Sequence, residues 1–389
     1  MKKQGNAIQS VFVVIALLCS VQALKGIDFR GYLESMNVSL LQGLNPPYPT
    51  HSAKNGDFFQ SPITAVFLIP LALLPMGIAK LIAWAYSFGG LFYLFRRATL
   101  GNLTNPSAFL LLLFFTHAIS DVFLSLNFLF LGLVLMWACH EWSLRKEPWG
   151  QLLSGLFFSV AVALRPMPLL LLPYFVLSPG RRRMLIWFFG WTAAWIALTL
   201  LVLPNPRLWW THWFSALPLY EQAASILVPA FQTPMAVLGR SFYFFSSVTL
   251  SQFAFIEKVI GLAFWGWAFF WALRLEKRGE KALGFALILS TLYCSFSRIW
   301  ACGFLYCYPF LSAVLCRNPS KIFWLLAIGY ALLPQWLWPI DTWDLLVSHY
   351  SLQGILILGS LILCWIWILK TFRSGHPHSE SPPRTTKHS

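Results

Sequence analysis

The sequence predicts an all-α integral membrane protein, a polytopic helical bundle of about twelve spans whose extracytoplasmic loops carry short helices. Of its 389 residues, 58% are hydrophobic and only 11% are charged, whereas soluble domains average about 25% charged residues. The mean hydropathy is +0.66. Apolar segments recur from residue 8 to residue 369 without an intervening polar block. We therefore expect one membrane domain over residues 1–373 and a short disordered cytoplasmic tail over residues 374–389.

The net charge of +15 follows the topology of a membrane protein and does not indicate nucleic-acid binding. Most Lys and Arg residues form short clusters at the ends of apolar runs, which is the positive-inside pattern. It predicts a multi-pass protein of the cell inner membrane with both termini in the cytoplasm. The seven cysteines lack metal-binding spacing, and no Asp-x-Asp pair occurs, so we expect no disulfide, no metal site and no cofactor.

The first half of the chain divides at its polar and proline residues. An uncleaved anchor helix over residues 7–24 follows Lys2-Lys3, which places residues 26–61 outside. Pro70 and Pro75 divide the next apolar run into a short helix and a membrane helix. The following pair of spans is predicted to turn at Ser120-Asp121.

The second half continues with a hairpin of two short helices, residues 151–164 and 167–177, around Arg165-Pro166. A second large outside region, residues 204–253, is rich in Trp and Pro. The remaining spans are expected at residues 184–203, 254–273, 282–296, 299–316, 322–336 and 352–369.

The loop over residues 26–62 is where the sequence predicts chemistry. It carries Asp28, Arg30, Glu34 and Asp57 directly after the first apolar helix, in a chain that is otherwise almost free of charge. Long charged loops at a membrane surface are more typical of function than of packing. Glu34 falls on a predicted amphipathic helix and is interpreted as solvated.

The order of motifs along the chain resembles glycosyltransferase family 87, polyprenyl-phosphate-sugar-dependent mannosyltransferases of the GT-C superfamily. An Asp follows the first span, and then come Leu-Gln-Gly-Leu-Asn-Pro-Pro-Tyr (41–48) and Phe-Gln-Ser-Pro (59–62). The resemblance continues in Ala-Leu-Arg-Pro-Met-Pro (163–168), in the segment from Phe231 to Arg240, and in Phe-Ser-Arg-Ile-Trp (296–300). The family's Gly-Gln-x-Asn motif is reduced to Leu-Ser-Leu-Asn (124–127), and histidines expected after residue 300 are replaced by Ala-Cys-Gly.

The resemblance implies that Asp28 is the catalytic base, because it matches the position of the family's catalytic Asp. A carboxylate at a membrane surface is partly desolvated, which increases its proton affinity. The alternatives are that Asp28 caps a helix or pairs with Arg30.

Arginine is the natural ligand for the donor's phosphate because its fork matches two phosphate oxygens. Arg165, Arg240 and Arg298 are the candidates, since all three are predicted away from the cytoplasmic clusters. Arg165 in an apolar hairpin needs a partner. That partner is either the lipid phosphate or Asp121, or else the arginine snorkels to the interface.

The remaining candidates are side chains that could bind the sugar, namely Tyr32, Asn45, Tyr48, His212 and Gln232. The tryptophans at 209, 210 and 213 are either interfacial anchors or a surface for a sugar or a prenyl tail.

The sequence thus predicts an inverting membrane hexosyltransferase with its active site on the extracytoplasmic side. It would move a hexose, with mannose as the named candidate, from a polyprenyl phosphate to a lipid-linked or surface glycan. Its partners would be this donor, the acceptor and membrane lipid, and no nucleic acid. The alternatives are a lipid or glycan transporter or flippase, and a non-catalytic assembly subunit that keeps the fold.

Overall fold

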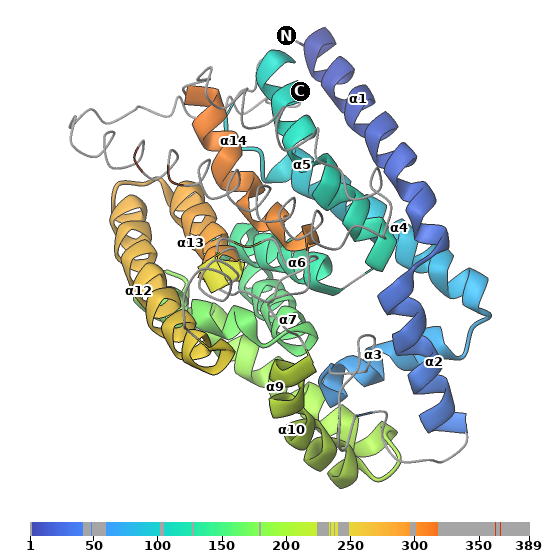
Figure 1. Cartoon of the computed structure of the whole chain (residues 1–389). Coiled ribbons are helices and arrows are strands. Elements are labelled where there is room, and N and C mark those ends of the chain that lie inside the picture. Colours follow the sequence, from blue (N-terminus) through green and yellow to red (C-terminus); the bar gives the residue numbers. More distant parts are fainter. Residues whose placement is uncertain are drawn as a thin grey trace.

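The fold is known from a computed structural model, which describes residues 2–41, 48, 60–101, 105–126, 128–178, 180–223, 233, 235, 236, 238, 239, 249–295, 301–317, 362 and 366. All elements in these residues are helices (Figure 1), as the sequence predicts. The spans expected at 322–336 and 352–369, and the tail at 374–389, fall outside the described parts apart from residues 362 and 366.

The chain begins with α1 (Lys2–Ser20), a short 3-10 helix η1 (Val21–Leu24) and α2 (Ile27–Leu41). The break between η1 and α2 lies at Gly26, whose φ of +48° is in the left-handed region that favours glycine. A Cβ at this position would also lie 3.2 Å from Leu126 and 3.3 Å from Lys80. The turn into α2 therefore depends on glycine.

Of the prolines expected to divide the next segment, Pro75 does so, whereas Pro70 lies inside α3. Pro62 occupies the first turn of α3 (Pro62–Ala72), where its missing N–H costs nothing, and Ser61 caps the helix. Pro75 precedes α4 (Met76–Arg97), which ends at its two basic residues. The predicted division into a short helix and a long one is confirmed.

The predicted turn at Ser120-Asp121 is wrong. Helix α5 (Asn105–Ser125) continues through both residues, and the break before α6 (Phe128–Ser143) lies at Leu126, whose φ is +49°. Neither Ser nor Asp excludes helical dihedrals as Pro does, so a buried polar pair inside the helix was mistaken for its end. Asp121 is consequently inside the bundle rather than in a loop.

The predicted hairpin around Arg165 is confirmed. Helix α7 (Pro148–Leu164) is followed by η2 (Met167–Leu171) and α8 (Leu172–Leu177), which return to the start of α9 (Arg182–Val202). α7 packs along α6 on one side and along α9 on the other. At the crossing with α9, a Cβ on Gly155 would lie 2.6 Å from the Cβ of Trp187, so the two backbones approach closely.

Helix α10 (Pro206–Ala223) lies at one end of the molecule beside α2 and α3 (Figure 1) and contacts α3 and α9. Helix α12 (Leu250–Lys277) packs along α13 (Lys281–Ser295). A capping box of Thr249 and Gln252 begins α12. The described bundle closes with η3 (Ala301–Cys307) and α14 (Tyr308–Arg317), which contact α5.

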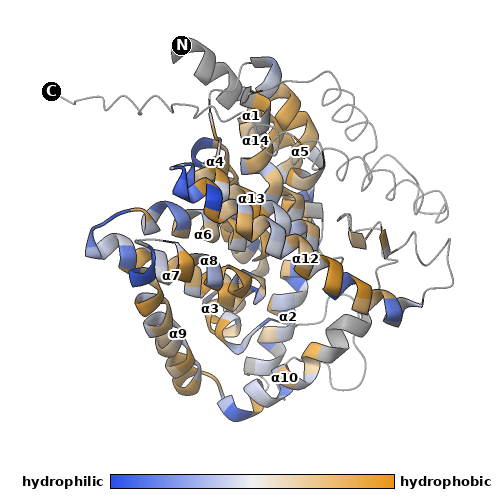
Figure 2. Ribbon diagram, turned by 90° about the vertical axis from the view of Figure 1, so that its left-hand side faces the viewer, coloured by the Kyte–Doolittle hydropathy of each residue, from blue (hydrophilic) through white to orange (hydrophobic). Residues whose placement is uncertain are grey.

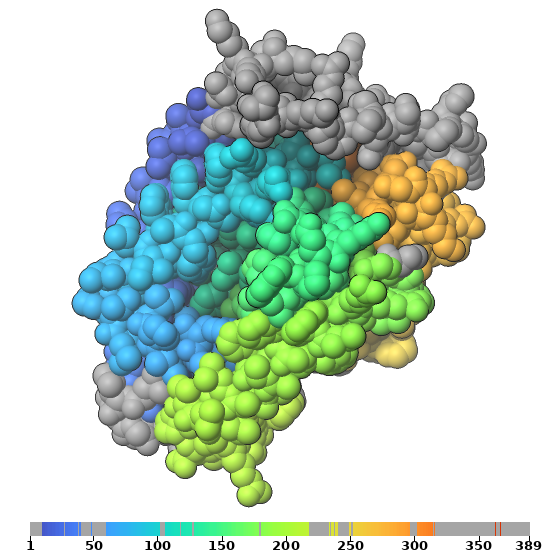
Figure 3. Space-filling model, turned by 180° about the vertical axis from the view of Figure 1, so that it is seen from behind, coloured from blue at the N-terminus to red at the C-terminus, as the bar shows by residue number. Residues whose placement is uncertain are grey.

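Several helices expose apolar faces suited to lipid. Of the described helices, α4, α9 and the segment Gln252–Lys277 of α12 are long and apolar enough to span a membrane, and two bent pairs raise the number to five. Twelve spans are therefore not confirmed. Helix α9 is hydrophobic along most of its length (Figure 2), and in Figure 3 it lies on the outer surface of the molecule. Exposed residues such as Ile186, Phe189 and Leu201 form this face.

Candidate functional site

Asp28 lies in the first turn of α2, directly after the glycine turn, and its side chain is buried. The turn is held by Lys80 of α4, whose Nζ donates to the carbonyl oxygens of Leu24 at 2.8 Å and Lys25 at 2.9 Å. A lysine at these carbonyls also suits the negative end of the preceding helix dipole. The first two helices and α4 thus place this carboxylate inside the protein.

The Asp28–Arg30 ion pair, which was one alternative to a catalytic role for Asp28, is not formed, although the structure describes both residues. The Nε of Arg30 donates instead to Glu34 Oε1 at 2.6 Å, one turn along α2, and the side chains of Arg30 and Glu34 are exposed. Glu34 is therefore on a solvated face, as predicted. An exposed pair of this kind contributes little to stability.

A second carboxylate, Asp121, lies buried in α5 near Asp28, close enough for the two charges to influence each other. The backbone N–H of Cys302, in the first turn of η3, donates to Asp121 Oδ2 at 2.8 Å. Asp121 thereby joins α5 to a segment 181 residues further along the chain. The break at Leu126 follows one turn later and is held by Tyr86, whose hydroxyl donates to the Leu126 carbonyl.

Arg165 ends α7 and is partly buried, with an extended backbone (φ −150°, ψ 132°). Its backbone N–H donates to the carbonyl of Ala161 at 3.1 Å. Two residues before it, the carbonyl of Ala163 accepts hydrogen bonds from the hydroxyl groups of Ser61 and Thr64, each at 2.7 Å. The start of α3 therefore holds the end of α7.

The charged groups of these three elements converge around Cys302. Its side chain lies within electrostatic range of Asp121, Asp28 and Arg165, and the neighbouring Tyr306 also lies within range of Arg165. Two carboxylates and a guanidinium in a largely apolar setting form an arrangement that can take up a proton and bind an anion. The structure thus brings together Asp28, Arg165 and Asp121.

The two described tyrosines among the predicted substrate-binding residues, Tyr32 and Tyr48, are both buried. Tyr32 lies one turn after Asp28, is buried, and stacks on Phe128 with the ring centroids 5.7 Å apart. The Tyr48 hydroxyl donates to the carbonyl of Gln60 at 2.9 Å. Burial raises the pKa of Tyr48 well above its usual value, which keeps this hydroxyl a donor.

His212, another predicted sugar-binding residue, lies within α10 and is half-buried. The tryptophans of α10 differ in role. Trp209 is buried, with its ring edge-to-face against Tyr48 at 5.9 Å. Trp210 donates through Nε1 to Thr199 Oγ1 at 3.2 Å, which attaches α10 to α9. Phe214, one turn later, is exposed.

Four further candidates lie outside the described residues, namely Asn45, Gln232, Arg240 and Arg298. Within the described parts of the chain, no group of three His, Cys, Asp or Glu side chains is arranged to hold a metal ion.

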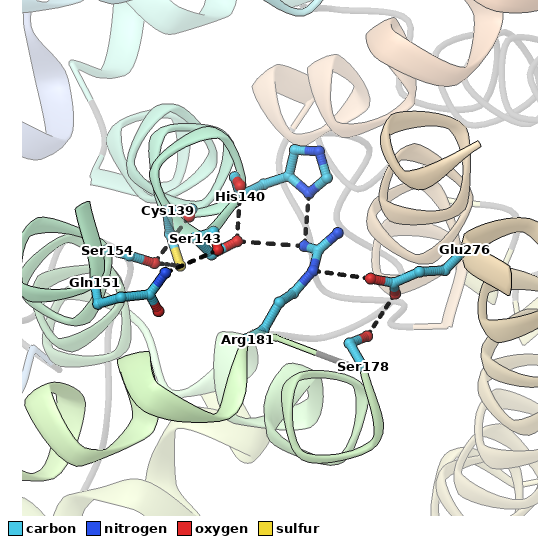
Figure 4. A network of polar contacts seen from close by, with 8 residues as sticks. All are labelled: Cys139, His140, Ser143, Gln151, Ser154, Ser178, Arg181 and Glu276. Carbon is cyan, nitrogen blue, oxygen red and sulfur yellow. Dashed lines mark hydrogen bonds and ion pairs between the residues drawn. The ribbon is translucent and has the colours of Figure 1, made fainter. Parts of the chain in front are cut away.

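A second polar cluster lies near the opposite end of α7, about 25 Å away for a helix of 17 residues. Arg181, which is 1% exposed, lies between Glu276 and His140 (Figure 4). Its Nε donates to Glu276 Oε1 at 3.0 Å and its Nη1 donates to His140 Nδ1 at 2.9 Å. Because arginine cannot accept a hydrogen bond, His140 is the acceptor and its imidazole is neutral.

Other side chains complete this network. Ser178 donates to Glu276 Oε2 at 2.5 Å, Ser143 Oγ lies 3.4 Å from Arg181 Nη1, and Gln151 donates to the carbonyl of Ser143. The network links α6, α7, α12 and the turn before α9. We interpret it as a structural lock, since the charge of Arg181 is balanced inside the protein.

Sequence reasoning named Asp121 only as a turn residue and as a possible partner of Arg165, and it missed the contributions of Ser61, Thr64 and Lys80. A signal existed for Asp121, because a carboxylate within an apolar helix is costly and commonly functional. Ser61 belongs to the Phe-Gln-Ser-Pro motif (59–62), but the motif does not indicate its bonding role. No signal marks Thr64, since small hydroxyl residues occur throughout apolar helices. For Lys80, the available signal was a lysine as the fifth residue of a largely apolar helix, α4.

Comparison with known proteins gives one match. Residues 58–297, more than half of the chain, match glycosyltransferase family 87. The match begins after Asp28 and includes Asp121 and Arg165. Neither a curated protein sequence nor a solved structure matches the chain.

Proposed function

Because the chain belongs to glycosyltransferase family 87, we propose that it transfers a hexose, with mannose as the first candidate, from a polyprenyl phosphate. The acceptor is a lipid-linked or surface glycan, and the site faces the extracytoplasmic side of the cell inner membrane. The observation that carries this proposal is the convergence of Asp28, Asp121 and Arg165 around Cys302.

In the proposed reaction, an acceptor hydroxyl oxygen attacks the sugar's C1 while the C1–O bond to phosphate breaks with inversion. Asp28 takes the proton of the acceptor hydroxyl, which a poorly solvated carboxylate does more readily than one in water. The polyprenyl phosphate leaves with the bonding electron pair. Arg165, with Arg298 and Arg240 as further ligands, stabilises the charge on this leaving group.

The sugar and acceptor contacts of the proposal are Tyr32, Asn45, Tyr48, His212 and Gln232. The burial of Tyr32 one turn after Asp28 supports its placement there. The exposed apolar faces of α4 and α9 provide lipid-facing surfaces along which an isoprenoid tail can lie.

The deciding experiment is the Asp28→Asn variant of the full chain, assayed with radiolabelled polyprenyl-phosphate hexoses and a lipid extract of host membranes as acceptor. We expect transfer to fall by about 10²–10⁴-fold, the usual contribution of a general base. Glu34→Gln on the exposed face of the same helix is the control and should keep wild-type turnover. Wild-type turnover of Asp28→Asn, with normal insertion, would refute the assignment of the base.

A further inference from the structure

We infer that Ser61 and Thr64 are positioning residues for Arg165, because their hydroxyl groups hold the carbonyl that ends α7 two residues before it. The catalytic part of this inference rests on the proposed function, in which Arg165 binds the donor phosphate. The structural part does not depend on that function.

The local sequence deprives the end of α7 of its usual hydrogen bonds. The chain leaves the helix at Arg165, whose backbone is extended, so the N–H of Met167 cannot reach the carbonyl of Ala163 in a helical bond. The next carbonyl, of Leu164, would need the N–H of residue 168, which is a proline. A buried carbonyl without a donor is costly, so Ala163 needs donors from elsewhere in the fold.

The start of α3 supplies two such donors. The hydroxyls of Ser61 and Thr64 both donate to the Ala163 carbonyl at 2.7 Å, and a carbonyl oxygen has two lone pairs for them. Each hydroxyl has one proton, so the 3.2 Å approach between Ser61 Oγ and Thr64 Oγ1 carries no further bond in this arrangement. Both side chains are buried, which protects these bonds from water.

The two hydroxyl groups are themselves held firmly. Ser61 caps α3 by accepting the backbone N–H of Thr64 at 3.3 Å, and Pro62 limits the backbone between them. The preceding residue, Gln60, accepts the hydroxyl of Tyr48. The support behind Arg165 is therefore a pre-formed helix start, and not a flexible side chain.

As a consequence, the backbone from which the long Arg165 side chain projects is held in place. With the carbonyl of Ala163 held, only Leu164 separates it from the arginine, whose own N–H is bonded to Ala161. Small displacements of a positioning group cost large factors in binding and rate. Loss of the two hydroxyls should therefore weaken donor binding and leave the acceptor's binding unchanged.

The experiment compares three variants of the full chain in detergent. Ser61→Ala/Thr64→Val removes both hydroxyls with little change in shape, Thr64→Ser keeps the second hydroxyl, and Thr291→Val is the control. Thr291 is buried in α13 and its hydroxyl bonds only to a carbonyl of its own helix, Leu287, at 2.9 Å.

The first measurement is hydrogen–deuterium exchange of the backbone over residues 161–169. The double variant should exchange faster in this segment, while Thr64→Ser and Thr291→Val match the wild type. Unchanged exchange in the double variant would overturn the inference.

The second measurement is steady-state transfer with the polyprenyl-phosphate hexose that the wild type uses. The double variant should show a KM for the donor raised about tenfold, with an unaltered KM for the acceptor and near wild-type kinetics in Thr64→Ser. Faster exchange without any change in donor KM would make the hydroxyls merely structural and overturn the inference. Absence of transfer by the wild type would instead refute the proposed function, and the exchange measurement would still decide whether the hydroxyls hold the hairpin.

Discussion

Each end of α7 lies beside a buried or partly buried arginine, and the two arginines are held in different ways. Arg181 is fully buried and donates to a carboxylate and to a neutral histidine in a network drawn from four parts of the chain. Arg165 is only partly buried, projects from an extended residue, and shares its surroundings with Asp28 and Asp121.

The difference separates a structural role from a functional one. The charge of Arg181 is balanced by Glu276 inside the protein, although its Nη2 makes no hydrogen bond within the described residues, and disturbing such a buried pair is strongly destabilising. An arginine at the partly exposed end of a helix, within electrostatic range of the same Cys302 as two carboxylates, can engage a ligand's phosphate. Burial of a charged group is therefore by itself a poor guide to the active site of this protein.

The largest effect is expected at the end of α7 where Arg181 is buried. Glu276→Gln leaves Arg181 buried without its counter-charge and should lower the stability by about 3–5 kcal/mol, measured as thermal or denaturant unfolding in detergent. Replacing both partners, as Arg181→Met/Glu276→Met, should recover much of the loss. If the single and double variants were equally destabilised, the network would not be the charge-balanced lock described above.

At the other end of α7, a change of Arg165 should lower activity rather than stability. Arg165→Lys keeps the charge but removes the fork that matches two phosphate oxygens, so transfer should fall by about 100-fold. The unfolding temperature should stay within a few degrees of the wild type. A large loss of stability in Arg165→Lys would place this arginine in the same structural class as Arg181.

The helix crossing between the two ends gives an intermediate effect. Gly155→Ala places a methyl group 2.6 Å from the Cβ of Trp187 and 2.7 Å from the backbone nitrogen of Phe188, and should cost about 1–3 kcal/mol. Gly190→Ala on α9 meets no atom within 4 Å and should be neutral or stabilising by up to about 1 kcal/mol. Comparable unfolding curves for the two variants would argue against close packing of α7 on α9.

The smallest effect is expected at the turn before Asp28. Lys80→Met removes the two hydrogen bonds to the carbonyls of Leu24 and Lys25 and should lower the stability by about 1 kcal/mol. Transfer should fall more than stability, since the same turn places Asp28. Lys80→Arg keeps hydrogen-bond donors, so its transfer rate should lie between those of the wild type and Lys80→Met. An unchanged transfer rate in Lys80→Met would show that the turn holds without the lysine.

Much of the helical architecture was predictable because it depends on local chemistry. Proline at 62, 75, 148 and 166 lies at the beginning or the end of a helix, where its fixed φ and missing N–H are tolerated, whereas Pro70 lies inside α3. The prediction of a turn at Asp121 was wrong because the residue's partner is not local. A polar residue in an apolar run either ends a helix or is satisfied by a partner, and the partner, Cys302, is 181 residues away.

The sequence by itself determined an apolar helical protein, its helix breaks at prolines and glycines, and the candidacy of Asp28 and Arg165. The helical character and the helix breaks follow from hydropathy and backbone restriction, which act over a few residues. The candidacy of the two residues rests on their charge in an apolar chain and, for Asp28, on the resemblance in the order of motifs. Only the tertiary structure decided that Asp121 joins Asp28, that Arg181 is locked by Glu276, and that Ser61 and Thr64 hold the end of α7 from about a hundred residues away. Hydroxyls and carboxylates have many possible partners along a chain, and the packing of the helices selects among them.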